Sequence, residues 1–338
     1  MLGGGGIVRR MIQFAHTYND IISIENLLGA WQEFIKGKRK KKDVQEFQLR
    51  LMDNIFSLHQ ELKDKTYQHE PYKHFKISDP KPRDIHKASV RDRLLHRALY
   101  RKLYPFFDRV FATDSYSCRL QKGTHKAVET FRRYFFRVSK NNTKTVWVLK
   151  CDIKKFFANI DHFLLYQILD KYIPNKDILW LIQNIVESFC STNKGIGLPL
   201  GNLTSQLLVN IYMNEFDQYV KHNLKIKYYI RYADDFVILS GDKKELKVVL
   251  RYIVRYLHEK LKLELHPDKV FIQTVASGVD FLGWVNFPKH RVLRTSTKRR
   301  MIKRINENPT PQSIISYIGL LKHGNAYGLQ NKISKFLK

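Results

Sequence analysis

The sequence predicts an α+β fold in which helices cover one face of a central antiparallel sheet. Helical periodicity dominates the first third of the chain, short apolar runs typical of strands mix with helices in the middle, and the end is helical and basic. The 338 residues correspond to about two domains as a prior, and 43% of them are hydrophobic, so the chain can bury a core.

The first half of the chain is predicted to be mostly helical until it reaches one buried strand. Its segments are a helix over 21–62 interrupted by the basic run 36–42, a proline-punctuated stretch over 70–83, a helix over 89–104 and a strand over 146–151. The strand ends at Asp152, and the basic run is either a solvated loop or a phosphate contact.

The second half alternates strands and helices. Asp161 precedes an apolar run and is predicted to cap a helix. Two apolar segments, 228–232 and 236–239, flank Ala233-Asp234-Asp235, which predicts a hairpin with two acids at its tip. The other expected elements are helices over 176–190, 203–220 and 243–262, strands near 269–274, 279–285 and 290–294, and a basic helical segment over 297–338.

The charge balance indicates a polyanionic partner. Lysine and arginine number 60 and aspartate and glutamate 31, so the formal net charge is +29. Nucleic acid is the simplest partner for such an excess. An anionic membrane is the alternative, but we find no long amphipathic basic helix and no apolar run near the ~20 residues of a membrane span. We therefore expect no membrane partner.

The cysteines and the first residues bear on cellular location. Cys118, Cys151 and Cys190 are too far apart in sequence to indicate a zinc knuckle or a redox pair, and we expect buried, reduced thiols in a cytoplasmic protein. The start lacks the apolar stretch of a secretory signal. We expect residues 1–18 to form a flexible tail, or the native start to lie near Met11.

Three acidic residues suggest a metal-dependent reaction. A strand ending in Asp152 and a hairpin carrying Asp234 and Asp235 would bring three carboxylates to one sheet edge, where their repulsion calls for a positive charge. Magnesium prefers oxygen ligands and needs few from the protein when phosphates supply the rest. Two such ions can serve phosphoryl transfer. The alternative is that Asp234-Asp235 is only a turn dipeptide.

Several motifs resemble those of reverse transcriptases. Tyr232-Ala233-Asp234-Asp235 resembles their catalytic box, and residues 150–157 resemble the motif with their first aspartate. Residues 197–206, Gly-Leu-Pro-Leu-Gly-Asn-Leu-Thr-Ser-Gln, resemble their template- and nucleotide-handling segment. Similar fingers motifs lie at 80–83, 92–96 and 114–127, and later palm motifs at 265–269 and 281–284.

From about Tyr18 onward the chain resembles one family in particular, the reverse transcriptases of diversity-generating retroelements, within the group II intron-like superfamily. The pointers are Thr204-Ser205-Gln206 and the segment 316–325. The resemblance implies an RNA-directed DNA polymerase that copies a template-repeat RNA into cDNA, with errors concentrated at template adenines. It implies binding of template RNA, cDNA–RNA heteroduplex and dNTPs, and a small basic partner, the accessory variability determinant.

The resemblance also implies a right-hand polymerase. Its fingers would span 19–145, its palm 146–288 with a fingers-like helical insertion over 170–195, and a short basic thumb 289–338. Two Mg²⁺ ions, which Mn²⁺ could replace, would be held by Asp152 and Asp234, with Asp235 as a further ligand and the carbonyl of Ile153 helping to hold the nucleotide-bound ion.

The dNTP-binding residues are likewise implied by matched positions. Arg83 and Lys81 would contact the triphosphate, and Arg suits phosphate because its guanidinium forks onto two oxygens. Phe157 would exclude nucleotides with a ribose 2′-hydroxyl; the alternative is that Phe157 is a core residue. If this segment is extended chain, the side chains of Phe157 and its neighbour Phe156 point in opposite directions.

Leu200, followed by Gly201, stands where retroviral enzymes carry a glutamine. An aliphatic side chain makes no hydrogen bond, and apolar fit discriminates weakly, so we expect relaxed selectivity opposite adenine. The alternative is that Leu200 is only a packing residue.

Template–primer contacts are expected from the remaining motif positions and from the basic end. The residues are Ser205, Gln206, Lys269, Gly283, Trp284, Lys298, Arg299 and Arg300. Backbone-directed charge suits the A-like heteroduplex, although a solvated basic face is the alternative.

Two other functions remain open: a group II intron-type or defence-associated reverse transcriptase, and a non-catalytic RNA-binding splicing cofactor. The presence of Asp152, Asp234 and Asp235 argues against a non-catalytic splicing cofactor.

Overall fold

The computed structural model describes residues 12–78, 82–191 and 193–337, and the chain folds into two compact units. One unit takes in residues up to Ala112, Lys155–Phe216 and Lys260–Leu263; the other takes in Thr113–Lys154, Asp217–Glu259 and Glu264–Lys338. Together they confirm the α+β class. The boundaries of fingers, palm and thumb stay predictions.

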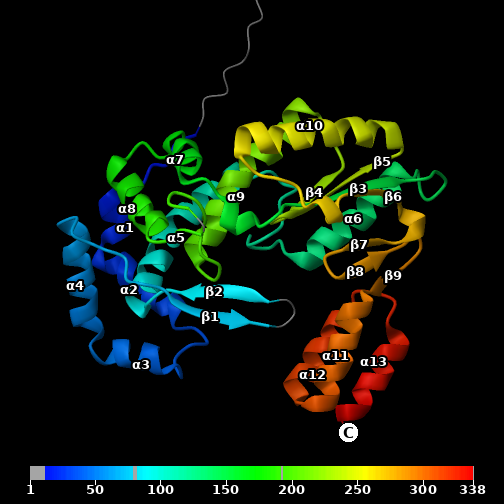
Figure 1. The fold of residues 1–338 in the computed structure, drawn as a ribbon. Helices are drawn as coiled ribbons and strands as arrows, with labels where there is room; N and C mark the ends of the chain where they lie inside the picture. Colours follow the sequence, from blue (N-terminus) through cyan, green and yellow to red (C-terminus); the bar gives the residue numbers. More distant parts are fainter. Residues whose placement is uncertain (1–11, 79–81, 192, 338) are drawn as a thin grey trace, which may run out of the picture. The chain divides into compact units, whose positions relative to one another are not determined.

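The described residues of the first unit form helices and one antiparallel pair of strands (Figure 1). Its elements are α1 (Tyr18–Ile22), α2 (Ile24–Phe34), α3 (Lys42–Leu49), α4 (Leu51–Lys63), β1 (Lys73–Ile77), β2 (Arg83–Lys87), α5 (Val90–Val110), η1 (Phe156–Asn159), α7 (His162–Asp170), α8 (Lys176–Glu187) and α9 (Leu203–Gln218), whose end belongs to the second unit. The predicted helix over 21–62 is thus a series of short helices, and the basic run forms the turn between α2 and α3.

Capping fixes where these helices begin. The Asp161 carboxylate accepts a hydrogen bond from the backbone N–H of Leu164 at 2.8 Å, which confirms the predicted cap of α7. Residues 1–11 of the predicted tail lie outside the described residues. Within the rest of it Phe14 is packed, since its side chain is 3% exposed and its N–H donates to the Tyr172 carbonyl. The expected flexibility therefore does not extend to Phe14.

The second unit holds both larger sheets. Its elements are α6 (Thr124–Val138), β3 (Trp147–Asp152), η2 (Tyr219–Asn223), β4 (Tyr229–Tyr232), β5 (Asp235–Ser240), α10 (Lys243–Leu261), η3 (Pro267–Lys269), β6 (Phe271–Thr274), η4 (Val275–Ser277), β7 (Val279–Phe281), β8 (Trp284–Asn286), β9 (Arg291–Leu293), α11 (Thr295–Glu307), α12 (Pro311–Leu321), α13 (Tyr327–Ser334) and η5 (Lys335–Leu337). The helical end is therefore confirmed.

The central sheet is antiparallel with strand order β4-β5-β3-β6. On one face, Val148 and Leu239 join a core cluster with Phe131 of α6. Leu149 and Ile238 occupy the alternate positions and are also buried, and Figure 1 shows α10 on the side away from α6. The prediction of helices on one face only is therefore wrong. Continuously apolar strands such as β5 require cover on both faces.

The second sheet has the order β7-β8-β9. The single strand predicted over 279–285 is instead a hairpin, β7–β8, in which Phe281 pairs with Trp284. Its turn residues Leu282 and Gly283 both have positive φ, 52° and 88°. A two-residue turn of this kind matches the twist of the flanking strands, which explains why glycine stands at one of the two positions.

The loop between α12 and α13 depends on a residue without a side chain. A Cβ at Gly324 would overlap the ring of Trp284, which is 1% exposed and fixed in the core. We expect Gly324→Ala to lower the free energy of unfolding by about 1–3 kcal/mol through overpacking. Urea unfolding followed by circular dichroism measures this.

Gly328 provides the matched control. It lies in α13, and an added Cβ would meet nothing within 4 Å. Gly328→Ala should leave stability unchanged or raise it slightly, since alanine favours helix. Equal effects of the two substitutions would show that the packing against Trp284 is not tight.

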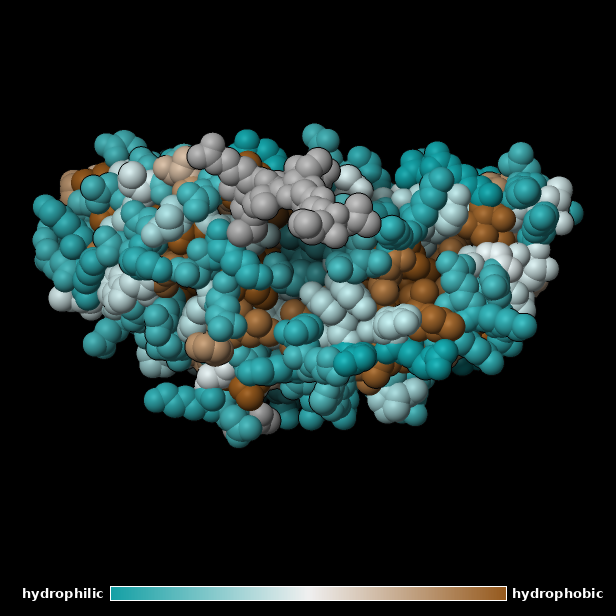
Figure 2. All heavy atoms as spheres, turned by 90° about the horizontal axis from the view of Figure 1, so that it is seen from above, coloured by the Kyte–Doolittle hydropathy of each residue, from teal (hydrophilic) through white to brown (hydrophobic). Residues whose placement is uncertain are grey.

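The surface agrees with the composition. Figure 2 shows hydrophilic residues over most of the visible face, with hydrophobic residues exposed in separate patches. None of the helices in the described ranges has an apolar stretch that could span a bilayer. Cys151 is buried, as expected, but Cys118 and Cys190 are exposed, so that expectation is wrong for two thiols; all three are free.

Candidate active site

Strand pairing brings the three predicted acids together within the second unit. Asp152, the last residue of β3, lies directly opposite Asp235, the first residue of β5. The backbone N–H of Ile153 donates to the Asp234 carbonyl at 3.1 Å. Residues directly opposite in an antiparallel pair have Cβ atoms about 5 Å apart. The acids therefore converge at one end of the two central strands.

The hairpin differs in one detail from the prediction. Tyr232 pairs with Asp235, so only Ala233 and Asp234 form the turn, and Asp235 belongs to the strand rather than to the tip. Ala233 has φ 55°, in the left-handed region that alanine adopts at a cost of about 1–2 kcal/mol. Such strain persists where surrounding contacts hold the backbone in place, and it is typical of functional turns.

Two lysines accompany the acids. Lys269 donates to the Asp152 carboxylate at 2.8 Å, and the Lys150 ammonium lies 3.6 Å from the Asp235 carboxylate while donating to the Asp280 carbonyl at 2.7 Å. Burial raises the pKa of the Asp235 carboxyl to about 7; Lys150 opposes this, and the neighbouring aspartates add to it. Oδ1 of Asp235 is buried without a hydrogen-bond partner.

The side chains at this site are of the type that binds magnesium ions. The available ligands are carboxylate oxygens, which Mg²⁺ prefers. Asp235 Oδ1 is buried without a hydrogen-bond partner and lies near other aspartates, and a divalent cation would offset the repulsion among these groups. Across the described ranges, no three Asp, Glu, His or Cys side chains form a ready metal cluster, and lysines now neutralise two of the carboxylates. A metal ion at Asp152 would have to share or replace the contact of this carboxylate with Lys269.

A buried ion pair contacts the turn between β4 and β5. Arg231 of β4 and Asp217 are both fully buried, and the guanidinium donates to the carboxylate through Nε at 2.7 Å and Nη2 at 2.6 Å. Nη2 also donates to Ser115 Oγ at 3.0 Å, and Nη1 donates to the Ala233 carbonyl at 3.1 Å. Arg231 thereby joins the core to the strained residue directly before Asp234.

The predicted nucleotide-binding residues lie in the first unit. Arg83 is exposed at the start of β2, and Lys81 lies outside the described residues. The segment with Leu200 and Gly201 is hydrogen-bonded to β2, since the His86 N–H donates to the Leu200 carbonyl at 3.1 Å. Gly201 has φ 107°. Thus Leu200, Gly201 and the strand of Arg83 are brought together.

Phe157 keeps a partly exposed ring while Phe156 is buried, as the prediction requires. The backbone reason is different, however. These residues form the 3₁₀ turn η1 and not extended chain, and their rings lie 5.5 Å apart at an interplanar angle of 73°. A role of Phe157 against the ribose 2′-hydroxyl stays a prediction.

The predicted template–primer residues fall into three groups. Lys298, Arg299 and Arg300 lie on α11, the first two of them exposed. Ser205 and Trp284 are buried in their cores, 2% and 1% exposed, so their side chains do not face a ligand in this structure. Gln206 is half-buried in α9, Gly283 forms a hairpin turn, and Lys269 contacts Asp152.

Sequence reasoning missed Lys150, Arg231 and Asp217. Lys150 stands two residues before Asp152 and so shares its face of β3, a signal that alternation could have given. Arg231 interrupts an apolar strand, and a charge there requires a buried partner. Nothing in the sequence identifies that partner as Asp217, which is 14 residues away.

An antiparallel sheet with carboxylates converging at the end of a strand and its neighbouring hairpin is the arrangement of a nucleic-acid polymerase palm. The chain belongs to the reverse transcriptase family, the RNA-dependent DNA polymerases, whose family model matches residues 76–285. It is therefore an RNA-directed DNA polymerase.

Its relatives include intron proteins. The chain is 27% identical to protein YkfC of Escherichia coli (strain K12) over 303 residues, which is 78% of this chain and 77% of that protein. It is 25% identical to the group II intron-encoded protein LtrA of Lactococcus lactis subsp. cremoris over 357 residues, 84% of this chain and 56% of LtrA. The putative COX1/OXI3 intron 1 protein of Saccharomyces cerevisiae is 23% identical over 77% of this chain and 38% of its own length. The chain thus spans about half the length of LtrA.

Proposed function

We propose that this reverse transcriptase copies a template-repeat RNA into cDNA with errors directed to template adenines, for mutagenic retrohoming into a target gene. The observation that carries the chemistry is the pairing of Asp152 with Asp235 beside Asp234. The retroelement type is supported by Thr204-Ser205-Gln206, the segment 316–325 and the apolar Leu200.

The reaction joins a primer 3′-hydroxyl to the α-phosphate of a dNTP and releases pyrophosphate. Asp152, Asp234 and Asp235, with the Ile153 carbonyl, would hold two Mg²⁺ ions, or Mn²⁺ in their place. The bound ions supply stabilisation of the negative charge that develops at phosphorus. Arg83 and Lys81 would orient the triphosphate, and Phe157 would exclude the ribonucleotide by its ring.

Leu200 is the proposed origin of the adenine-directed errors. Its carbonyl is fixed by β2 while its side chain stays partly exposed, so an apolar surface is offered at a constrained position. Such a surface selects by shape alone, and selection by shape is weak. Leu200→Gln should therefore lower misincorporation opposite template adenine, on the order of five- to tenfold for one added hydrogen bond.

The measurement is sequencing of cDNA made on one defined RNA. Errors opposite the other template bases serve as the internal control, and Leu200→Met, which keeps an apolar side chain of similar volume, should leave the spectrum unchanged. An unaltered error spectrum in Leu200→Gln would assign the residue to packing alone.

A second candidate, a group II intron-type reverse transcriptase, has its own support in the relationship to LtrA over 84% of this chain. Gene neighbourhood separates the two. A template repeat, a variable repeat and a small gene for a basic protein would favour the retroelement, and a surrounding intron RNA would favour the second candidate.

The proposed partners follow from the first candidate. They are the template RNA, the cDNA–RNA heteroduplex on the basic residues of α11, and a small accessory variability determinant. We propose action in the cytoplasm, where free thiols such as Cys118 and Cys190 persist.

A further inference from the structure

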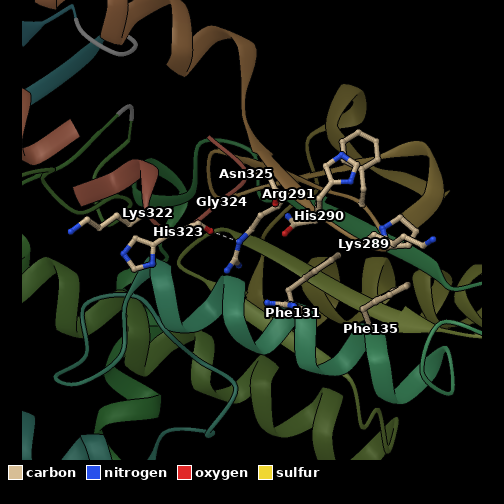
Figure 3. Close-up of a pocket in the computed structure, with 13 residues that line it drawn as sticks. Phe131, Phe135, Lys289, His290, Arg291, Lys322, His323, Gly324 and Asn325 are labelled. Carbon is tan, nitrogen blue, oxygen red and sulfur yellow. Dashed lines mark hydrogen bonds between the residues drawn. The ribbon is translucent and has the colours of Figure 1, made fainter. Parts of the chain in front are cut away.

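A basic groove lies in the second unit, apart from the strands that carry the acids. It is formed by two adjoining pockets of about 230 and 590 Å³ that share Lys322, Gly324 and Asn325. Its walls come from α6, the β8–β9 turn, the loop after α12 and the start of α13 (Figure 3). None of the lining residues belongs to β3, β4 or β5.

The groove is held in shape by contacts with Arg291 of β9. The Arg291 guanidinium donates to the His323 carbonyl and pairs with Glu129 of α6, and the Asn325 N–H donates to the Arg291 carbonyl at 2.8 Å. Close packing of Gly324 on Trp284 fixes the same loop. A ligand would therefore meet a preformed surface, which reduces the ordering cost of binding.

The charge of the groove selects for an anion. Arg132, Lys289 and Lys322 are exposed along it, and none of the described residues that line the two pockets is acidic. The neighbouring acid, Glu129, forms an ion pair with Arg291. The three exposed cations are thus available to phosphates, which bind through such sequence-independent contacts.

Flat side chains accompany the cations. The rings of Phe287 and His290 are stacked 4.8 Å apart, and those of His125 and His323 are 3.6 Å apart. Tyr327, at the other end of the groove, is 77% exposed. Aromatic and imidazole faces next to a basic track are the composition of sites that bind single strands, whose unpaired bases are free to stack.

We propose that this groove binds a single-stranded segment of RNA that is not part of the template–primer duplex. Its phosphates would lie along Arg132, Lys289 and Lys322, and a base would stack on Tyr327. This proposal rests on the chain being an enzyme that acts on RNA. It does not require that the enzyme copies RNA with adenine-directed errors.

Binding of a fluorescent 12-nucleotide RNA, measured by anisotropy over a series of salt concentrations, tests the proposal. Unlabelled template–primer duplex is kept at saturation, so that the polymerase channel is occupied. Lys289→Ala with Lys322→Ala should weaken binding about tenfold and reduce the salt slope by about 1.4, the value for two phosphate contacts of a single strand. Tyr327→Ala should weaken it about 5- to 100-fold.

Two matched controls sharpen the comparison. Lys244→Ala with Lys247→Ala removes the same charge from the exposed face of α10, and Tyr252→Ala removes an exposed aromatic ring there. Both should leave binding unchanged within twofold. Equal losses in the α10 variants, or unaltered binding in the groove variants, would overturn the proposal.

Primer extension keeps this test separate from the proposed function. On a pre-annealed template–primer at saturation, the groove variants should extend at the wild-type rate. Loss of extension with intact single-strand binding would place these residues in the polymerase channel and contradict the proposal. A wild-type protein that binds the RNA but extends nothing would contradict the polymerase function alone.

Discussion

Asp234→Asn is expected to lower kcat for dNTP incorporation by ~10³-fold or more. The substitution keeps the size of the side chain but removes the negative charge in the turn between β4 and β5. Charge stabilisation by a bound metal ion contributes several kcal/mol to phosphoryl transfer, and each 1.4 kcal/mol corresponds to a factor of ten. Single-nucleotide extension of an annealed primer measures the loss.

The control for this prediction is the binding of substrate. Template–primer affinity should stay within a few-fold of wild type, and thermal unfolding should be little changed, because Asp234 is in the turn and not in the core. Asp152→Asn should behave in the same way. Activity within tenfold of wild type in both variants would contradict the assignment of the metal site.

Arg231→Lys is expected to lower kcat about 10- to 100-fold while the KM for dNTP and the affinity for template–primer change little. Lysine can pair with Asp217, but its three donors sit on one nitrogen, whereas Arg231 reaches the Asp217 carboxylate with Nε and Nη2 and the Ala233 carbonyl with Nη1. One charge-assisted hydrogen bond contributes about 1.5–3 kcal/mol. We infer that Arg231 positions Asp234 through this bond, and we therefore expect the effect to fall on kcat.

Ser115→Ala is the matched variant for this prediction. It removes a contact of the same guanidinium that does not reach the turn, so kcat should stay near wild type. Arg231→Gln combined with Asp217→Asn removes both buried charges together, so that neither is left uncompensated. Full activity in this double variant would show that the contact with Ala233 is not needed.

Much of the fold could be predicted because it depends on local patterns. Apolar residues at helical spacing predicted α5 and α8, and the side chain of Asp161 marked the start of α7. Tyr228–Tyr232 and Phe236–Leu239 predicted the hairpin of β4 and β5. The convergence of the acids followed from where the strands end, and register then placed Asp152 opposite Asp235.

The rest depends on contacts distant in sequence. A single strand over 279–285 was the natural prediction from an apolar run, and the positive φ of Leu282 beside Gly283 broke it into a hairpin. Helices on both faces of the sheet follow from tertiary packing of α6 and α10. The pairing of Arg231 with Asp217 and of Lys269 with Asp152 joins distant segments, which no local pattern specifies.

The most direct test of the account is deep sequencing of cDNA made by the purified protein on a defined RNA template with Mg²⁺ and dNTPs, in the presence of any small basic protein encoded nearby. We expect RNA-dependent product with errors concentrated at template adenines. Product with errors spread evenly over the four template bases would contradict the mutagenic function and leave a reverse transcriptase of the intron type.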